Sequence, residues 1–258
     1  MNNNYYIDFE FLEGTQTKRF LGIPYGKTKP TIDIISVGII DNNNREYYAV
    51  SKDFNLHEAW NRYDLKYNTG MGDANNLPPK KVYWIRDNVL KPIFDEWKME
   101  MNSKIIRIGL PVSLNEMDFT YKNFKYCITQ IGKTNKQIAK DIKKFIGSKV
   151  TIGNWDEIKD IFKPNFIGYY SAYDHVCLAW LYGKMIDLPS SFKMYTYDLK
   201  QLMDDKVDKL NINEPKLDVE LILNSIKNNP YYPKEPNKHN SLSDAKFNKE
   251  LHNFLKSI

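Results

Sequence analysis

The sequence predicts an α/β fold in which a mixed β-sheet is flanked by helices. Three observations support this prediction: strand-like segments fill the first fifty residues, helix-like segments dominate the second half, and one further strand lies between those helices. Strands followed by interleaved helices and strands are typical of a layered α/β protein. The length of 258 residues suffices for one large domain or two small ones.

The N-terminal segments have the composition of β-strands. Tyr5–Leu12 is short, aromatic and apolar, and Thr31–Ile40 is β-branched and almost continuously apolar, as in a strand buried on both faces. An Asn-rich turn at Asp41–Arg45 leads into Glu46–Ser51, so these segments predict a hairpin. Glu13–Pro30 is rich in Gly, Thr, Lys and Pro, and we expect it to be a loop.

The middle of the chain predicts two helices with strands between them. Lys81–Glu100 has helical spacing and should be broken near Pro92. Ile105–Ile131 alternates apolar and polar residues and should add two or more strands. Thr134 and Gln137 form a capping-box pattern that should begin the second helix.

The C-terminal half predicts a buried strand and two capped helices. Ile161–Tyr170 should be a strand in its last half, and Ser171 should cap a helix that stops at Gly183. Ser241 should cap the last helix after the polar stretch Asn213–Pro236. The inward-facing residues should be Val176, Cys177, Trp180 and Leu181 on the first helix and Phe247, Leu251, Phe254 and Leu255 on the last.

Composition and charge limit the classes of protein to which this chain can belong. The longest apolar stretch, Val176–Tyr182, is far shorter than the ~20 residues of a bilayer helix, and the N-terminus lacks a secretory pattern. Cys127 and Cys177 make no disulfide framework, so we expect buried reduced thiols in a cytoplasmic protein without a membrane partner. The net charge is +5. If four carboxylates gather in one site, the remainder carries +9 and would attract a polyanion; the alternative is an ordinary lysine-rich surface.

Asp8 and Glu10 lie two apart in the first strand. Alternation places both on one face, roughly 7 Å apart at the backbone. Like charges on a largely buried strand need a compensating positive charge, and hard Mg²⁺ or Mn²⁺ prefers carboxylate oxygens. The alternative is an edge strand on which both acids face solvent.

Two further acids begin predicted helices. Asp174 lies in the first turn of a helix that follows a buried strand, where ligands of α/β sheets gather. Asp244 has the same position on the last helix, and His239 precedes it by five residues. The alternatives are that both acids only stabilise helix dipoles and that His239 is a surface residue.

Taken in order, these elements resemble the DEDDh exonuclease superfamily, the DnaQ-like and RNase T-like group, and within it the small bacterial and phage 3′–5′ exoribonuclease branch. The pattern is Asp-x-Glu on a first strand, Asp on a middle helix, and His-x4-Asp on the last. The resemblance covers about two-thirds of the chain and implies an RNase H-like fold. A single exonuclease domain over 1–258 is then expected, with insertions near 100–133, which would add β-structure, and 213–236. The supporting segments are Tyr6–Phe11, Ile35–Ile39, Arg45–Ser51, Trp84–Leu90 and Ala172–Pro189.

The resemblance also implies site roles. Asp8, Glu10, Asp174 and Asp244 would hold two Mg²⁺ or Mn²⁺ ions. His239 would be the general base, since an unperturbed imidazole titrates near pH ~6.5. The enzyme would be a metal-dependent hydrolase that releases nucleoside 5′-monophosphates from single-stranded 3′ ends, with RNA favoured over DNA, and could be a homodimer. Candidate residues for stacking the terminal base are Phe11 and Tyr173, which could instead be ordinary packing residues.

Two other functions stay open. One is a 3′–5′ DNA exonuclease of proofreading or repair type, because sugar choice depends on local geometry. The other is a non-catalytic RNase H-like module that binds nucleic acid, since a fold does not dictate a function. The complete set of four acids with His239 argues against the second.

Overall fold

The computed structural model describes residues 3–67, 78–107, 114, 116–147, 163–213, 219–234 and 239–258. The chain divides into two compact units. The first contains Met1–Glu10, Ser36–Ala49 and Lys133–Ile258, and the second contains Phe11–Ile35 and Val50–Gly132. The sequence-based division into one domain with two insertions stays a prediction.

Among the described residues, five strands form a mixed sheet in the order β5-β4-β1-β8-β9, and most of its residues belong to the first unit. Strand β8 pairs in parallel with β1, with Asn4 opposite Asn165 and Tyr6 opposite Ile167, and β9 pairs in parallel with β8. The predicted mixed sheet flanked by helices is therefore confirmed. The strands are β1 (Asn4–Gly14), β4 (Thr31–Asp41), β5 (Glu46–Val50), β8 (Asn165–Gly168) and β9 (Tyr197–Asp198).

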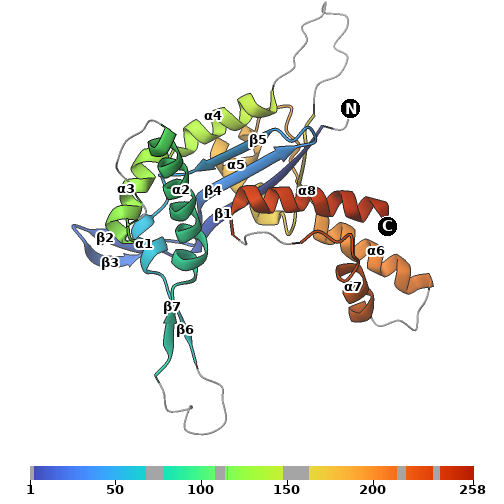
Figure 1. The fold of residues 1–258 in the computed structure, drawn as a ribbon, viewed down its shortest axis with the longest axis horizontal. Coiled ribbons are helices and arrows are strands. Elements are labelled where there is room, and N and C mark those ends of the chain that lie inside the picture. Colours follow the sequence, from blue (N-terminus) through green and yellow to red (C-terminus); the bar gives the residue numbers. More distant parts are fainter. Residues whose placement is uncertain are drawn as a thin grey trace, which may run out of the picture. The chain divides into compact units, whose positions relative to one another are not determined.

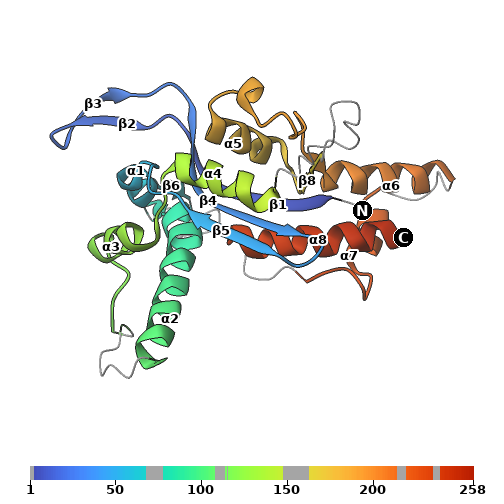
Figure 2. The same cartoon turned by 90° about the horizontal axis from the view of Figure 1, so that it is seen from above.

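Helices cover both faces of this sheet. Helices α4 (Asn135–Ile146) and α5 (Ala172–Tyr182) lie over one face, and α8 (Ser241–Ser257) lies over the other (Figures 1 and 2). The predicted capping box is present at the start of α4, where Thr134 and Gln137 bond reciprocally. Helices α6 (Leu199–Asn213) and α7 (Val219–Lys227) complete the layer beside α8.

The core beneath α8 is built from the stripe that the sequence predicts. Tyr6 and Ile167 of the sheet pack there against α6, α7 and α8. Burying a large apolar side chain contributes roughly 1.5–3 kcal/mol, so this stripe holds α8 firmly on the sheet. The predicted residues of α8 are all buried: Phe247, Leu251, Phe254 and Leu255.

Helices α5 and α8 differ from the prediction in detail. On α5, Cys177 and Leu181 are buried as expected, but Trp180 is 47% exposed, so its inward assignment was wrong. On α8 the N-cap is Asn240, whose side chain accepts a hydrogen bond from the N–H of Ser243, and Ser241 is the first helical residue. Asn and Ser are both good N-caps, so the sequence pattern did not decide between them.

The second unit contains two small hairpins and a group of helices. Its helices are α1 (Leu56–Asn61), η2 (Arg86–Leu90), α2 (Lys91–Arg107) and α3 (Tyr121–Ile131). The first hairpin joins β2 (Thr17–Phe20) to β3 (Ile23–Lys27), and the second joins β6 (Asp64–Lys66) to β7 (Lys80–Val82).

Three predictions for this unit need correction. Glu13–Pro30 is not a loop, because it contains the β2–β3 hairpin. Ile105–Ile131 gives no strand among its described residues: α2 runs to Arg107, and Tyr121–Ile131 is α3, with Phe124, Cys127 and Ile128 buried at helical spacing. The extra β-structure lies in the two hairpins instead. The break expected near Pro92 is a π-helical turn, η2, that precedes α2.

Three smaller expectations can be checked on the described residues. Cys127 and Cys177 are free and buried, as expected. The polar stretch Asn213–Pro236 contains helix α7, and residues 214–218 and 235–236 lie outside the described residues. Across the parts of the chain that the structure describes, each helix is too short or too polar to span a membrane.

Candidate active site

Three of the predicted carboxylates converge. Asp8 and Glu10 lie on one face of β1, and Asp244 lies in the first turn of α8. One carboxylate oxygen from each of these residues lies within 4.8 Å of the other two. Asp244 is more than 230 positions from Asp8 and Glu10 in the sequence, so the packing of α8 on the sheet creates this cluster.

Asp174 is hydrogen-bonded to the same strand. The backbone N–H of Phe9 donates a hydrogen bond to Asp174 Oδ1 over 3.0 Å. Because Phe9 stands between Asp8 and Glu10, this bond fixes the first turn of α5 beside both acids. Asp174 is only 5% exposed, and its charge acts on those of Asp8 and Glu10.

The electrostatics of the cluster disfavour full ionisation. Burial, followed by the charges of Asp174, Glu10 and Asp244, raises the pKa of Asp8 well above its ordinary value. Burial and the neighbouring acids raise the pKa of Glu10 to about 8. Burial also raises the pKa of Asp174 to about 8, although the hydrogen bond from Phe9 opposes the change. Such a group of acids either binds protons or a cation.

His239 lies beside these acids. Its Nδ1 is 4.0 Å from Glu10 Oε1, and its side chain is about one-third exposed. The backbone of His239 has a φ of 65°, in the left-handed region. This turn precedes Asn240, the N-cap of α8, and so brings His239 and Asp244 to the cluster from one end of one helix.

Two residues that sequence reasoning missed position the helices of the site. Asp198 of β9 accepts hydrogen bonds from the N–H groups of Tyr170 and Ser171, each over 3.1 Å, and its charge acts on Asp174. Asn248, which is 2% exposed, donates from Nδ2 to the carbonyl of Ile7 over 3.0 Å. The only sequence signal for either was a polar residue in an apolar context.

A hydroxyl pair holds the start of α8. Ser36 Oγ on β4 lies 3.1 Å from Ser241 Oγ, and both side chains are buried. Since Asp244 follows Ser241 by less than one helical turn, this contact limits how far Asp244 can move relative to the sheet.

The two candidate stacking residues have different surroundings. Tyr173 precedes Asp174 in α5 and is half exposed, so its ring has a face available to a ligand. Phe11 is partly buried and belongs to the second unit. His175 contacts Thr196 Oγ1 through Nδ1 over 3.2 Å, and burial lowers its pKa, which fits a structural role.

A cavity of about 340 Å³ lies elsewhere in the first unit. It is lined by Asn4 and Asn165, the first residues of β1 and β8, and by Lys193, Tyr197 and His252. It therefore lies near the amino ends of these two strands, whereas Asp8 and Glu10 lie in the middle of β1.

The fold and the site together define an α/β protein in which acidic residues of β1 and of the first turns of α5 and α8 gather. Carboxylate clusters of this kind are typical sites for divalent cations. No protein-family model matches the chain.

Over 202 residues the chain is 24% identical to proteins named 3′-5′ exoribonuclease from two strains of Mycobacterium tuberculosis, CDC 1551 / Oshkosh and H37Rv. The aligned region is 78% of this chain and 74% of each relative. This distant similarity supports a relationship to a nuclease family.

Proposed function

We propose that this chain is a divalent-metal-dependent 3′–5′ exoribonuclease. The observation that carries the proposal is the convergence of Asp8, Glu10 and Asp244 within 4.8 Å, with Asp174 hydrogen-bonded between the first two. The names of the two mycobacterial relatives support RNA as the substrate and the 3′ end as the starting point.

The residues of the cluster fit divalent cations. All four donors are carboxylates, the ligands that Mg²⁺ and Mn²⁺ prefer. Burial and mutual repulsion raise the pKa values of Asp8, Glu10 and Asp174, and a bound cation would relieve that repulsion. Asp8, Glu10, Asp174 and Asp244 would hold the metal, and we propose two ions, because four carboxylates balance two dications. When bound, the metal would activate water and stabilise the charge that develops on the scissile phosphate and the leaving oxygen.

The protein's own groups would perform the remaining tasks. His239 can accept the proton of the attacking water, because its imidazole lies beside Glu10 and is open to solvent on one side. Its backbone turn, held by the N-cap Asn240, orients the ring toward the acids. Tyr173 would stack the terminal base, since it is half exposed and precedes Asp174 in the sequence.

Digestion of matched oligonucleotides tests the function. RNA and DNA of the same sequence, labelled at either end, are incubated with Mg²⁺, Mn²⁺ or chelator. The proposal expects mononucleotides from the 3′ end of RNA, activity with either metal, and none with chelator. Preferential digestion of DNA would instead identify a DNA exonuclease.

The matched variants are Asp244→Asn, which removes one charge from the cluster, and Asp64→Asn, an exposed acid of β6. Asp244→Asn should abolish digestion, whereas Asp64→Asn should leave it at the wild-type rate. Equal activity of both variants would show that Asp244 is not part of the active site. No digestion of either nucleic acid by the wild type would refute the nuclease function.

A further inference from the structure

The β2–β3 hairpin exposes an unusual set of apolar side chains. Four of its residues are between 67% and 87% exposed: Phe20, Leu21, Ile23 and Tyr25. Phe20 pairs with Ile23 across the hairpin, and the turn between them uses left-handed backbone at Leu21 and Gly22. Large apolar groups gathered on a protruding surface mark a binding site more often than a solvated one.

The same segment carries a concentrated positive charge. Lys18, Arg19, Lys27 and Lys29 are all exposed, and no acidic residue occurs between Gly14 and Ile32. The segment therefore contributes +4, whereas the net charge of the whole chain is +5. Cations interleaved with exposed aromatic rings are the composition of surfaces that bind single-stranded nucleic acid.

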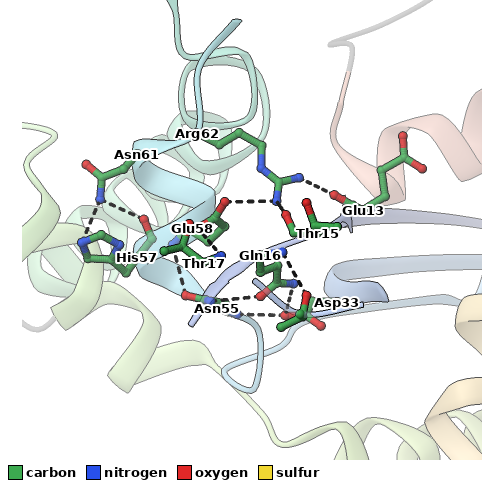
Figure 3. Close-up of polar contacts among 11 residues, drawn as sticks. Glu13, Thr15, Gln16, Thr17, Asp33, Asn55, His57, Glu58, Asn61 and Arg62 are labelled. Atoms are coloured by element: carbon green, nitrogen blue, oxygen red, sulfur yellow. Dashed lines mark hydrogen bonds and ion pairs between the residues drawn. The ribbon is translucent and has the colours of Figure 1, made fainter. Parts of the chain in front are cut away.

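A buried amide fixes the base of the hairpin. Gln16, which is 4% exposed, donates from Nε2 to Asp33 Oδ2 over 2.8 Å and accepts from Asn55 Nδ2 over 3.0 Å. Its backbone exchanges two hydrogen bonds with Thr28, at the end of the second arm. Figure 3 shows Gln16 between Asp33 and Asn55.

An ion pair on α1 extends this anchor. The guanidinium of Arg62 donates to the carbonyls of Glu13 and Thr15 and to Glu58 Oε1 (Figure 3). Glu58 in turn accepts a hydrogen bond from the backbone N–H of Thr17, the first residue of β2, over 3.2 Å. The β2–β3 hairpin is therefore fixed at its base before any partner binds, which reduces the entropy lost on binding.

We propose that the β2–β3 hairpin binds single-stranded RNA. The inference rests on the proposed function and names a second contact of the same substrate. Phosphates would pair with Lys18, Arg19 and Lys27, and bases would stack on Phe20 and Tyr25.

The charge of the hairpin favours RNA over a second copy of this chain. A second copy is itself positively charged, so a cationic arm would meet repulsion on average, whereas an RNA strand carries one negative charge for each nucleotide. If the hairpin bound a second copy, it would be expected to carry acidic residues that complement the positive charge of that copy. The hairpin has no acidic residue between Gly14 and Ile32.

Binding in chelator tests the inference independently of catalysis. The dissociation constant of a 5′-fluorescein-labelled single-stranded RNA of about 20 nucleotides, longer than a typical single site, is measured by anisotropy at several salt concentrations. The variants are Lys18→Ala/Arg19→Ala and Phe20→Ala/Tyr25→Ala. The matched control is Lys122→Ala/Lys125→Ala, which removes two exposed lysines of α3. Hydrolysis of a dinucleotide in Mg²⁺ is measured in parallel.

The two hairpin variants should lose affinity in different ways. Removing Lys18 and Arg19 should raise the dissociation constant ~10-fold. It should also reduce the slope of log affinity against log salt concentration by roughly 1.4, the value expected for the loss of two phosphate contacts on a single strand. Removing Phe20 and Tyr25 should raise it at least ~5-fold with the slope unchanged, because stacking is not ionic. The control and dinucleotide hydrolysis should stay at wild-type values.

The remaining outcomes separate the inference from the function. Unchanged RNA affinity in both hairpin variants would overturn the inference, even in an active nuclease. A drop from dimer to monomer in light scattering of Phe20→Ala/Tyr25→Ala, with RNA affinity unchanged, would assign the hairpin to a second copy instead. Loss of RNA affinity in the variants of a protein that cleaves no RNA would support the hairpin's role and reject the nuclease.

Discussion

The backbone of Ser241 lies directly against Gly38. A Cβ atom built on Gly38 would come within 2.2 Å of the Ser241 carbonyl oxygen and 2.3 Å of the N atom of Leu242. Only glycine therefore permits the start of α8 to approach β4 this closely. The same approach brings Asp244 to the acids of β1.

Gly38→Ala should destabilise the protein and weaken its metal site. The added methyl group meets backbone, which cannot rotate away, so we expect a loss of ~3 kcal/mol, the upper end for overpacking. Thermal unfolding with and without Mn²⁺ measures both effects. Ser36→Ala, which removes only the hydroxyl contact with Ser241, should cost less. Equal melting temperatures for Gly38→Ala and wild type would show that α8 is not held here.

Asp8→Asn should stabilise the metal-free protein. It removes one charge from a cluster in which burial and three neighbouring acids raise the pKa of Asp8. Each tenfold change in acidity between the folded and unfolded states corresponds to ~1.4 kcal/mol. Denaturant unfolding in chelator should show a higher midpoint for Asp8→Asn than for wild type, and Mn²⁺ should stabilise only the wild type. A lower midpoint in chelator would contradict the electrostatic argument.

The stability of the metal-free protein should fall as pH rises from ~4 to ~8. Glu10 and Asp174 have folded-state pKa values of about 8, above their ordinary values of 4.5 and 3.8. In that window the folded state binds more protons than the unfolded state, so ionisation on raising the pH favours unfolding. Denaturant unfolding in chelator at pH 5 and pH 8 measures the slope. The double variant Glu10→Gln/Asp174→Asn should have a flatter slope, and an unchanged slope would remove these residues as its cause.

His239→Asn should slow hydrolysis by roughly 100-fold or more, the usual contribution of a general base. Asparagine is the appropriate substitution, because it tolerates the left-handed backbone of residue 239 better than alanine does. The acidic limb of the pH–rate profile should disappear, while stabilisation by Mn²⁺ should persist. A profile that keeps its shape would exclude His239 as the base.

His252 should make stability depend on pH in the opposite direction. Burial and the charge of Lys256 lower its pKa to about 4, while its Nδ1 lies 2.9 Å from the hydroxyl of Tyr6. The unfolded state takes up the proton first, so His252 disfavours the folded state as pH falls from ~6.5 to ~4. The difference in unfolding free energy between wild type and His252→Gln should shrink or reverse from pH 7 to pH 5. A constant difference would contradict the lowered pKa.

The sequence predicted the elements whose signals are local. Asp8 and Glu10 share a face because strands alternate with a period of two. Asp244 follows Asn240, whose side chain caps α8, and Asp174 follows Ser171, which is the N-cap of α5 by position but makes no side-chain capping bond. Asp198 and Asn248 could not be found in this way. Their roles depend on backbone groups that lie 28 and 241 residues away in the sequence.

The errors in the second unit also have physical causes. The β2–β3 hairpin is exposed on both faces, so its strands lack the alternation that identifies a half-buried strand. Helix α3 contains aromatic residues that favour strands, but Thr120 caps it and burial of Phe124, Cys127 and Ile128 decides its structure. Tertiary packing overrode local preference there.

The register of β1 against β8 has a consequence for how the protein is made. A slip of one residue would turn Asp8 and Glu10 to the opposite face of the sheet. Strand β1 is held between β4 and β8, and its pairing with β8 places Asn4 opposite Asn165, which lies 161 residues later. Asp244, the third acid of the cluster, leaves the ribosome more than 230 residues after Asp8 and Glu10. The ability to capture metal should thus appear only late in translation.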